Sequence, residues 1–231
     1  MKIVSGISLA LTALLFSGCD VELINGDGKG FNSDFQQGES GWTAGFSDYP
    51  VDNAPIYQLE SGIRTLPAGF NGQGYLLSGM NRSDDLFMFL KQRLTGLEPS
   101  TRYYARLRVS FLTNAGENCM GVGGAPGESV YMKLGYHQSE PKQEGYYLNA
   151  DKGQQSQGGS QAAVIGHVGS KDALCDGSRF AEKTIQTSTS ERLQLHTDAT
   201  GAVWVFLGTD SGYEGLTQLY YRRIELALER Y

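Results

Sequence analysis

Acidic side chains beside glycines and serines mark several predicted strand ends, and carboxylates in such places can bind a ligand or a cation. Asp84 and Asp85 follow an Asn-Arg-Ser run and precede a strongly apolar segment. Oxygen ligands of this kind suit Ca²⁺, although no EF-hand spacing is present. Asp84 and Asp85 are therefore the candidate ligands for a structural calcium ion. Two loop carboxylates could instead act as acid and base in a polysaccharide-cleaving enzyme, but their separation cannot be read from the sequence.

A sugar-binding site needs exposed aromatic faces beside hydrogen-bonding groups. The chain contains 13 tyrosines, and several of them stand in predicted loops together with Trp42 and Phe46. The candidate ligand-binding residues are Tyr49, Glu128, Asp151, Lys152, Asp210, Tyr213 and Glu214, which we expect to share one loop-lined site. The alternative to sugar binding is that the aromatic residues pack in the hydrophobic core. Trp204, between two valines, is predicted to do so.

Signatures of catalysis and of nucleic-acid binding are missing from the sequence. The three histidines, His137, His167 and His196, have no ligand spacing, and no Gly-x-Ser-x-Gly elbow occurs. The glycine-rich run at 121–129 lacks the Lys-Ser/Thr of a phosphate loop. The formal net charge is −6, which disfavours nucleic acid as a partner. No catalytic residue is assigned.

The elements that must position these residues read as β-strands. Along Tyr103 to Phe111 apolar and polar residues alternate, which is the period of a strand with one buried face. The preceding arm, from Leu86 to Leu90, is apolar on both faces and must be covered on both sides. We expect these two arms to form a β-hairpin, and a second hairpin to join 193–196 to 202–208. Long glycine-rich or polar loops are expected at 114–129 and 140–161.

The first residues have the features of a secretion signal. Lys2 precedes a short apolar run at 7–16, and Leu15 to Cys19 (LFSGC) resembles the bacterial lipobox. In that family the cysteine is lipidated and becomes the first residue, which implies residues 1–18 as signal peptide and Cys19 as a lipid-bearing membrane anchor. A plain secretion signal and a transmembrane anchor are the alternatives, but the run is shorter than the ~20 residues that a spanning helix needs. Asp20 resembles an inner-membrane retention signal.

Two further cysteines, Cys119 and Cys175, form the candidate disulfide. Outside the cytoplasm two cysteines are more often bridged than free. Two buried thiols or a metal pair remain as alternatives, and the sequence offers the metal few further ligands.

The run 96–103 (GLEPSTRY) sets a turn with Gly and Pro and places Tyr103 in the core with its hydroxyl towards the turn. This arrangement resembles the jelly-roll carbohydrate-binding modules of the galactose-binding-like superfamily, whose members often hold a structural calcium. The chain also resembles a group of bacterial lipoproteins of uncharacterised activity. We therefore predict an all-β chain with a tether at 19–33 and a single jelly-roll β-sandwich with long glycine-rich loops at 34–231.

The predicted function is that of a lipoprotein in the bacterial cell envelope, anchored outside the cytoplasm, whose domain binds a glycan or another envelope ligand. A structural or assembly lipoprotein that binds a protein partner is the alternative, and a polysaccharide-acting enzyme is a third. Membrane attachment through the lipid is expected in each case.

Overall fold

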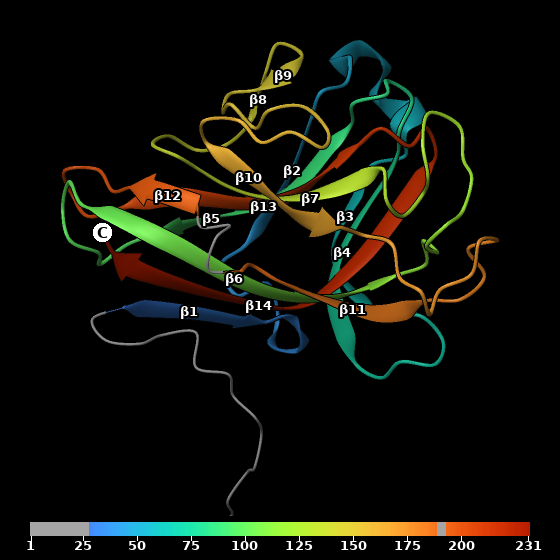
Figure 1. Ribbon diagram of the computed structural model, residues 1–231, viewed down its shortest axis with the longest axis horizontal. Coiled ribbons are helices and arrows are strands. Elements are labelled where there is room, and N and C mark those ends of the chain that lie inside the picture. Colours follow the sequence, from blue (N-terminus) through green and yellow to red (C-terminus); the bar gives the residue numbers. More distant parts are fainter. Residues whose placement is uncertain (1–27, 189–192) are drawn as a thin grey trace, which may run out of the picture.

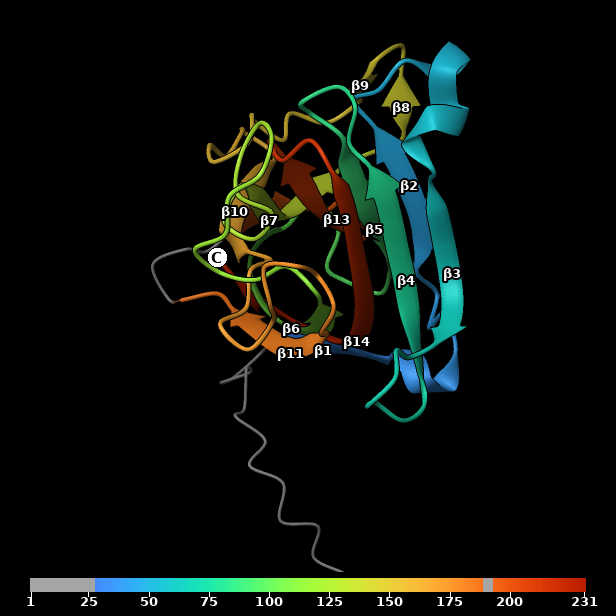
Figure 2. The ribbon, with the colours of Figure 1, turned by 90° about the vertical axis from the view of Figure 1, so that its right-hand side faces the viewer.

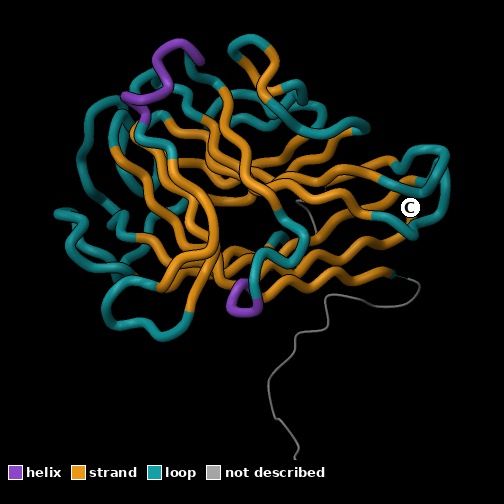
Figure 3. The backbone as a smooth tube through the Cα atoms, turned by 180° about the vertical axis from the view of Figure 1, so that it is seen from behind, coloured by secondary structure: helices purple, strands orange, loops and turns teal. Residues whose placement is uncertain are grey.

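The computed structural model describes residues 28–188 and 193–231. The predicted signal peptide, Cys19 and most of the predicted tether lie outside the described residues. Strands dominate the described chain, and the two short helical segments lie at its periphery (Figure 3). The elements are β1 (Lys29–Asp34), η1 (Phe35–Gln37), β2 (Thr43–Ser47), η2 (Val51–Tyr57), β3 (Glu60–Thr65), β4 (Gln73–Met80), β5 (Phe87–Leu94), β6 (Arg102–Thr113), β7 (Val130–His137), β8 (Gln143–Glu144), β9 (Tyr147–Leu148), β10 (Ala162–His167), β11 (Ala181–Gln186), β12 (Leu193–His196), β13 (Val203–Ser211) and β14 (Leu216–Arg230).

Two antiparallel sheets form the layers of a β-sandwich (Figure 1). The seven-stranded sheet, here called sheet A, has the order β11-β6-β14-β4-β3, with β12 also paired to β6 and β1 also paired to β14. The five-stranded sheet, sheet B, has the order β10-β7-β13-β5-β2. In the side view β3 forms the free edge of sheet A beside β4 (Figure 2). The predicted all-β jelly-roll sandwich is confirmed.

The chain crosses between the sheets at nearly every connection from β4 to β7 and from β10 to β14. Both predicted hairpins are therefore wrong. β5 pairs with β2 and β13 in sheet B, whereas β6 pairs with β11, β12 and β14 in sheet A. Likewise β12 belongs to sheet A and β13 to sheet B. Alternation tells which face of a strand is buried, but it does not tell which strand lies beside it.

The main core fills the space between the sheets, and a smaller core covers the outer face of sheet B. Leu86, Met88 and Leu90 belong to the main core. Phe87 and Phe89 point the other way and pack with Phe206 beneath Leu148 and Ala150 of the segment 138–161. The prediction that this strand is covered on both sides is therefore confirmed.

In this second core an aromatic ring packs directly against the backbone of the neighbouring strand. The outer-face ring of Phe206 lies over its cross-strand partner Gly135, where an added Cβ would come within 2.1 Å of the ring. A side chain at Gly135 would therefore displace the ring, which explains a glycine inside a central strand.

The turn before β6 has the predicted arrangement. The Tyr103 ring is buried, and its hydroxyl accepts a hydrogen bond of 3.0 Å from the Glu98 backbone N–H. The bond fixes the corner where the chain passes from sheet B to sheet A.

Other sequence predictions meet the structure at the edges of the domain. β1 pairs with β14 from Lys29 onward, so the sheet already includes the last residues assigned to the tether. Cys119 and Cys175 form the predicted disulfide, with their Cα atoms 5.4 Å apart. None of the helices in the described part of the chain has the length and apolarity to cross a membrane.

Candidate functional site

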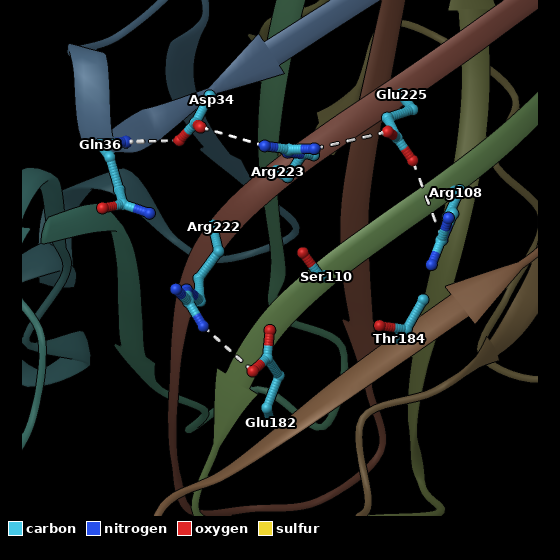
Figure 4. A pocket seen from close by; sticks show the side chains of 9 residues that line it. All are labelled: Asp34, Gln36, Arg108, Ser110, Glu182, Thr184, Arg222, Arg223 and Glu225. Carbon is cyan, nitrogen blue, oxygen red and sulfur yellow. Dashed lines mark hydrogen bonds and ion pairs between the residues drawn. The ribbon is translucent and has the colours of Figure 1, made fainter. Parts of the chain in front are cut away.

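A polar groove of about 320 Å³ lies on the outer face of sheet A (Figure 4). It crosses β11, β6, β14 and the junction of β1 with η1. Its lining consists of charged, amide and hydroxyl side chains: Asp34, Gln36, Arg108, Ser110, Glu182, Thr184, Arg222, Arg223 and Glu225. Since adjacent strands lie about 4.8 Å apart, the groove spans roughly 14 Å across the strands.

Directly opposed cross-strand pairs build the floor of the groove. The register sets Asp34 against Arg223, Glu225 against Arg108, and Thr184 against Ser110. Side chains of such pairs stand on the same face and within reach of each other. The three pairs follow one another across the sheet, so the backbone ladder fixes their spacing.

A β-bulge in β14 brings two consecutive arginines to this face. The register with β6 shifts between Tyr221 and Arg223, which leaves Arg222 as the extra residue. An extra residue interrupts the alternation of faces, so Arg222 and Arg223 both line the groove. The bulge also marks the point where the partner of β14 changes from β4 to β1.

The ion pairs of the groove differ in closeness. Arg222 Nη1 donates to Glu182 Oε2 at 3.0 Å, and Arg223 Nη2 donates to Asp34 Oδ2 at 3.2 Å. The Glu225 carboxylate lies 3.8 Å from Arg108 Nε through Oε2 and 3.8 Å from Arg223 Nη1 through Oε1. These last two separations exceed a hydrogen bond.

Hydrogen-bonding capacity therefore remains unused in the groove. Arg222 Nε is buried without a partner among the described residues. Neither the Ser110 nor the Thr184 hydroxyl, both of which line the groove, is hydrogen-bonded to another described side chain. The groove thus presents donors and acceptors side by side on a rigid sheet, which is an arrangement suited to a polar ligand.

A second feature is a buried charge cluster on the outer face of sheet B, formed by Asp48, Asp85, Lys133, Lys152 and Asp210. Asp210 Oδ2 accepts from Lys133 Nζ at 2.7 Å and from Lys152 Nζ at 3.0 Å. Lys152 Nζ also lies 3.5 Å from Asp48 Oδ1 and 3.8 Å from Asp85 Oδ1. Lys133 completes its bonds with the carbonyls of Lys152 and Gln157, so the cluster fastens the segment 138–161 onto the sheet.

Burial and mutual charge shift the pKa values within this cluster. Burial, reinforced by Asp210 and Asp48, raises the pKa of Asp85 to about 6 against the opposing effect of Lys152. Burial also raises the pKa of Asp48. Burial alone would lower the pKa of Lys152, but the surrounding carboxylates outweigh it and raise that pKa. For Lys133 burial prevails over Asp210 and lowers the pKa.

No protein-family model and no curated protein matches this chain. Among solved structures, it is similar to the K3 cleaved adhesin domain of Lys-gingipain from Porphyromonas gingivalis W83, at 12% identity and a TM-score of 0.42 over 87% of this chain and 98% of that one. It is also similar to the mannan-recognising module TmCBM27, at 12% identity and a TM-score of 0.39 over 86% and 96%. A third is TmCBM61 in complex with β-1,4-galactotriose, at 10% identity and a TM-score of 0.34 over 86% and 94%. At such values the ligands of these neighbours say nothing about this chain.

The structure disperses the ligand-binding residues predicted from the sequence. Lys152 and Asp210 meet in the buried charge cluster. There Asp210 Oδ2 accepts hydrogen bonds from the Lys152 ammonium and from the Gln155 backbone N–H. Asp151 is exposed and accepts bonds from Ser160 and Gly153 within its own loop, and these hydrogen bonds lower its pKa. Tyr49 packs its ring against that of Tyr57, 5.1 Å away.

The other three residues lie in or against the glycine-rich loop. Glu128 belongs to the loop, whereas Tyr213 and Glu214 contact it from the connection between β13 and β14. Glu128 Oε1 accepts from the Asn118 backbone N–H at 2.6 Å. The Tyr213 ring lies close to Gly121 and Gly215, and the Glu214 N–H donates to the Val122 carbonyl. These contacts order the loop. The prediction of one shared site for all seven residues is therefore not met by the geometry.

Asp151 and Lys152 do line a smaller cleft of about 170 Å³ together with Asp48 and Tyr147. Tyr147 is 63% exposed, whereas Trp42 is buried and donates to Ser33 Oγ. Trp204, predicted as core, points out of sheet B and is half-buried, because its neighbours Val203 and Val205 take the inward positions.

The calcium candidates diverge. Asp84 is exposed and its carbonyl accepts from Gln155 Nε2, whereas Asp85 faces the Lys152 ammonium. Within the described residues, no group of three or more His, Cys, Asp or Glu side chains is arranged to hold a metal ion.

Sequence reasoning missed the groove because its residues come from segments distant in the chain. One signal for it was present. In β14 the core residues fall on odd positions at Leu219 and Tyr221 but on even positions from Ile224. A change of parity inside one strand indicates a bulge, and the bulge here coincides with the two arginines.

Proposed function

We propose that this protein is a lipid-anchored, extracytoplasmic module that binds a glycan in the polar groove of sheet A. The observation that carries the proposal is the unused hydrogen-bonding capacity on a rigid floor. Arg108 and Glu225 stand 3.8 Å apart, and the Ser110 and Thr184 hydroxyls lie beside them. A groove formed of such pairs is costly to dehydrate unless a ligand supplies matching hydrogen bonds.

A polyhydroxylated ligand matches this lining better than other classes. Each sugar hydroxyl both donates and accepts, so it satisfies a carboxylate and a guanidinium at once. An apolar ligand would find no apolar side chain in the groove lining. A nucleic acid would need an excess of positive charge, whereas three arginines here face three carboxylates.

A glycan array followed by calorimetry on the purified chain tests the proposal. The double variant Arg222→Gln/Glu182→Gln removes one groove ion pair without leaving either charge alone. We expect it to weaken binding at least about tenfold, because a well-made charged hydrogen bond contributes about 1.5 kcal/mol or more. The control is Lys142→Gln/Glu144→Gln, which removes an exposed pair on the β8–β9 side. An array without hits, or equal binding by both double variants, would refute the proposal.

Membrane anchoring through Cys19 belongs to the same proposal. It is supported by the lipobox-like run at 15–19 and by the Cys119–Cys175 bridge, a bond typical of oxidising compartments. We expect Cys19→Ser to move the protein from the membrane fraction to the soluble fraction and to abolish labelling with palmitate. Asp20 favours the inner membrane, which separation of the two membranes checks. Unchanged fractionation of Cys19→Ser would exclude the anchor.

One observation favours protein docking as a second function. The disulfide-bridged loop exposes Met120 and Val122, by 99% and 68%. Exposed apolar side chains on an ordered loop are typical of contact surfaces between proteins. Cross-linking from this loop in cells would capture one stoichiometric envelope protein if this function exists, and its loss in Met120→Ser/Val122→Ser would assign the surface.

A further inference from the structure

We infer that Glu225, set between Arg108 and Arg223, is a receptor for the vicinal diol of a neutral sugar. This inference rests on the proposed glycan-binding function and names the ligand chemistry of the same groove. The two oxygens of the Glu225 carboxylate face different guanidinium groups. Oε2 lies 3.8 Å from Arg108 Nε and Oε1 lies 3.8 Å from Arg223 Nη1.

Each of these separations admits a bridging hydroxyl. A gap of 3.8 Å between nitrogen and oxygen is too long for a direct hydrogen bond. An oxygen placed about 2.9 Å from both atoms completes a triangle with them, accepts from the guanidinium and donates to the carboxylate. A hydroxyl oxygen does both at once, whereas no single atom of an amide or an ammonium group does.

Two such gaps on one carboxylate call for two neighbouring hydroxyls. A carboxylate accepts one hydrogen bond on each oxygen in a bidentate arrangement. Hydroxyls on adjacent ring carbons reach both oxygens of Glu225 together, and each then meets its own guanidinium. Hydroxyls on opposite sides of a ring lie too far apart to do so.

The receptor is held in place before any ligand arrives. Glu225 and Arg108 are direct cross-strand partners, as are Arg223 and Asp34. Arg223 Nη2 donates to Asp34 Oδ2 at 3.2 Å, and the Gln36 backbone N–H fixes Asp34 Oδ1 at 3.0 Å (Figure 4). The Glu225 side chain is 18% exposed, so little motion is left to lose on binding.

Charge balance selects a neutral sugar. The groove holds Arg108, Arg222 and Arg223 against Asp34, Glu182 and Glu225, so its formal charge is zero. A uronic acid would place a second anion beside Glu225, and an amino sugar would place a cation beside the two guanidinium groups. Either charge would compete with an ion pair that already exists.

Calorimetry with a matched panel tests the inference on the purified chain. The probes are the neutral oligosaccharides that bind on an array, their uronic acid and amino sugar counterparts, and derivatives with one hydroxyl of the diol methylated. We expect the neutral sugars to bind at least tenfold more tightly than the charged and methylated ones. Glu225→Gln, which replaces one acceptor oxygen by a donor, should lose at least tenfold, and Glu229→Gln on the same strand outside the groove should lose nothing.

The outcomes separate the inference from the function on which it rests. If no glycan binds, both fail. If a charged sugar binds best, or if Glu225→Gln binds normally while Arg222→Gln/Glu182→Gln does not, the groove remains a glycan site and the diol receptor is refuted. Circular dichroism of each variant confirms that the fold is intact.

Discussion

At the residue scale, the buried charge cluster carries one more carboxylate than ammonium group. Asp48, Asp85 and Asp210 surround Lys152, and Lys133 supplies the other positive charge. Asp85 Oδ1 and Asp210 Oδ1 are both buried without a hydrogen-bond partner among the described residues. A proton on Asp85 removes the surplus negative charge. Burial, together with the Asp210 and Asp48 carboxylates, therefore raises the pKa of Asp85 to about 6.

This raised pKa makes the stability of the fold depend on pH. Between about pH 4 and 6 the folded state holds a proton that the unfolded state has released, since an unfolded Asp has a pKa of about 3.9. The contribution of Asp85 to the free energy of unfolding should therefore fall as the pH rises through this window. Asp85→Asn removes the contribution of Asp85 to this pH dependence and raises stability at pH 7 by on the order of 1–3 kcal/mol. Urea unfolding from pH 4 to 7 measures it.

The neighbouring Asp84 provides the matched control. Its side chain is exposed and its backbone has a φ of 59°, a conformation that Asn tolerates. Asp84→Asn should keep the pH profile of the parent protein. An identical profile for Asp85→Asn would mean that Asp85 is ionised throughout and that the surplus charge is carried elsewhere.

At the scale of elements, the bulge in β14 is the device that separates the groove from the core. From Leu216 to Tyr221 and from Arg223 onward the strand keeps regular pairing, and Arg222 is the single residue added between the two parts. Removing it restores an unbroken alternation, with Tyr221 and Ile224 both still facing the core and every register pair unchanged.

We therefore predict that deletion of Arg222 leaves the fold intact. The change in the free energy of unfolding should stay within about 1 kcal/mol, the usual contribution of a partly exposed ion pair such as Arg222 with Glu182. Deletion of Glu225 shortens the strand equally but turns Arg223 inward and Ile224 outward. That burial of an unpaired charge should cost at least about 3 kcal/mol. Thermal unfolding of both deletion variants measures the difference. An equal loss of stability in the two would contradict the role given to the bulge.

Elements with a regular alternation were predictable from sequence, and their neighbours in space were not. The inward and outward faces of Tyr103 to Phe111 and of Ile224 to Leu228 are as the pattern indicates. The pairing of β5 with β13 rather than β6 depends on a corner that turns between sheets, which no local pattern specifies. The groove has the same cause. In the sequence, Arg108, Glu182 and Glu225 each look like ordinary charged residues on the solvent-exposed face of a strand. Only the pairing of the strands in the sheet brings the three together.

At the scale of the whole molecule, the disulfide joins the two long connections that leave sheets A and B at one end. Cys119 lies in the glycine-rich loop between β6 and β7, and Cys175 lies between β10 and β11. Between them Gly116 and Ser170 form an isolated parallel bridge, and the Gly169 N–H donates to the Gly127 carbonyl. The pairing of the cysteines was predictable from their count and the compartment that the sequence predicts, whereas these backbone contacts were not.

Replacing both cysteines tests how far the two connections depend on each other. The bond closes a loop with a sequence separation of 56, so the entropy model gives a stabilisation of about 4 kcal/mol. Cys119→Ala/Cys175→Ala should lower the free energy of unfolding by about 3–4 kcal/mol in urea, and dithiothreitol should do the same to the parent protein. Glycan binding in the groove should survive under conditions in which the variant is fully folded, because the groove lies on strands that the disulfide does not touch. If reduction leaves the unfolding curve unchanged, the backbone contacts around Gly116 and Gly127 hold this end of the sandwich without the bond.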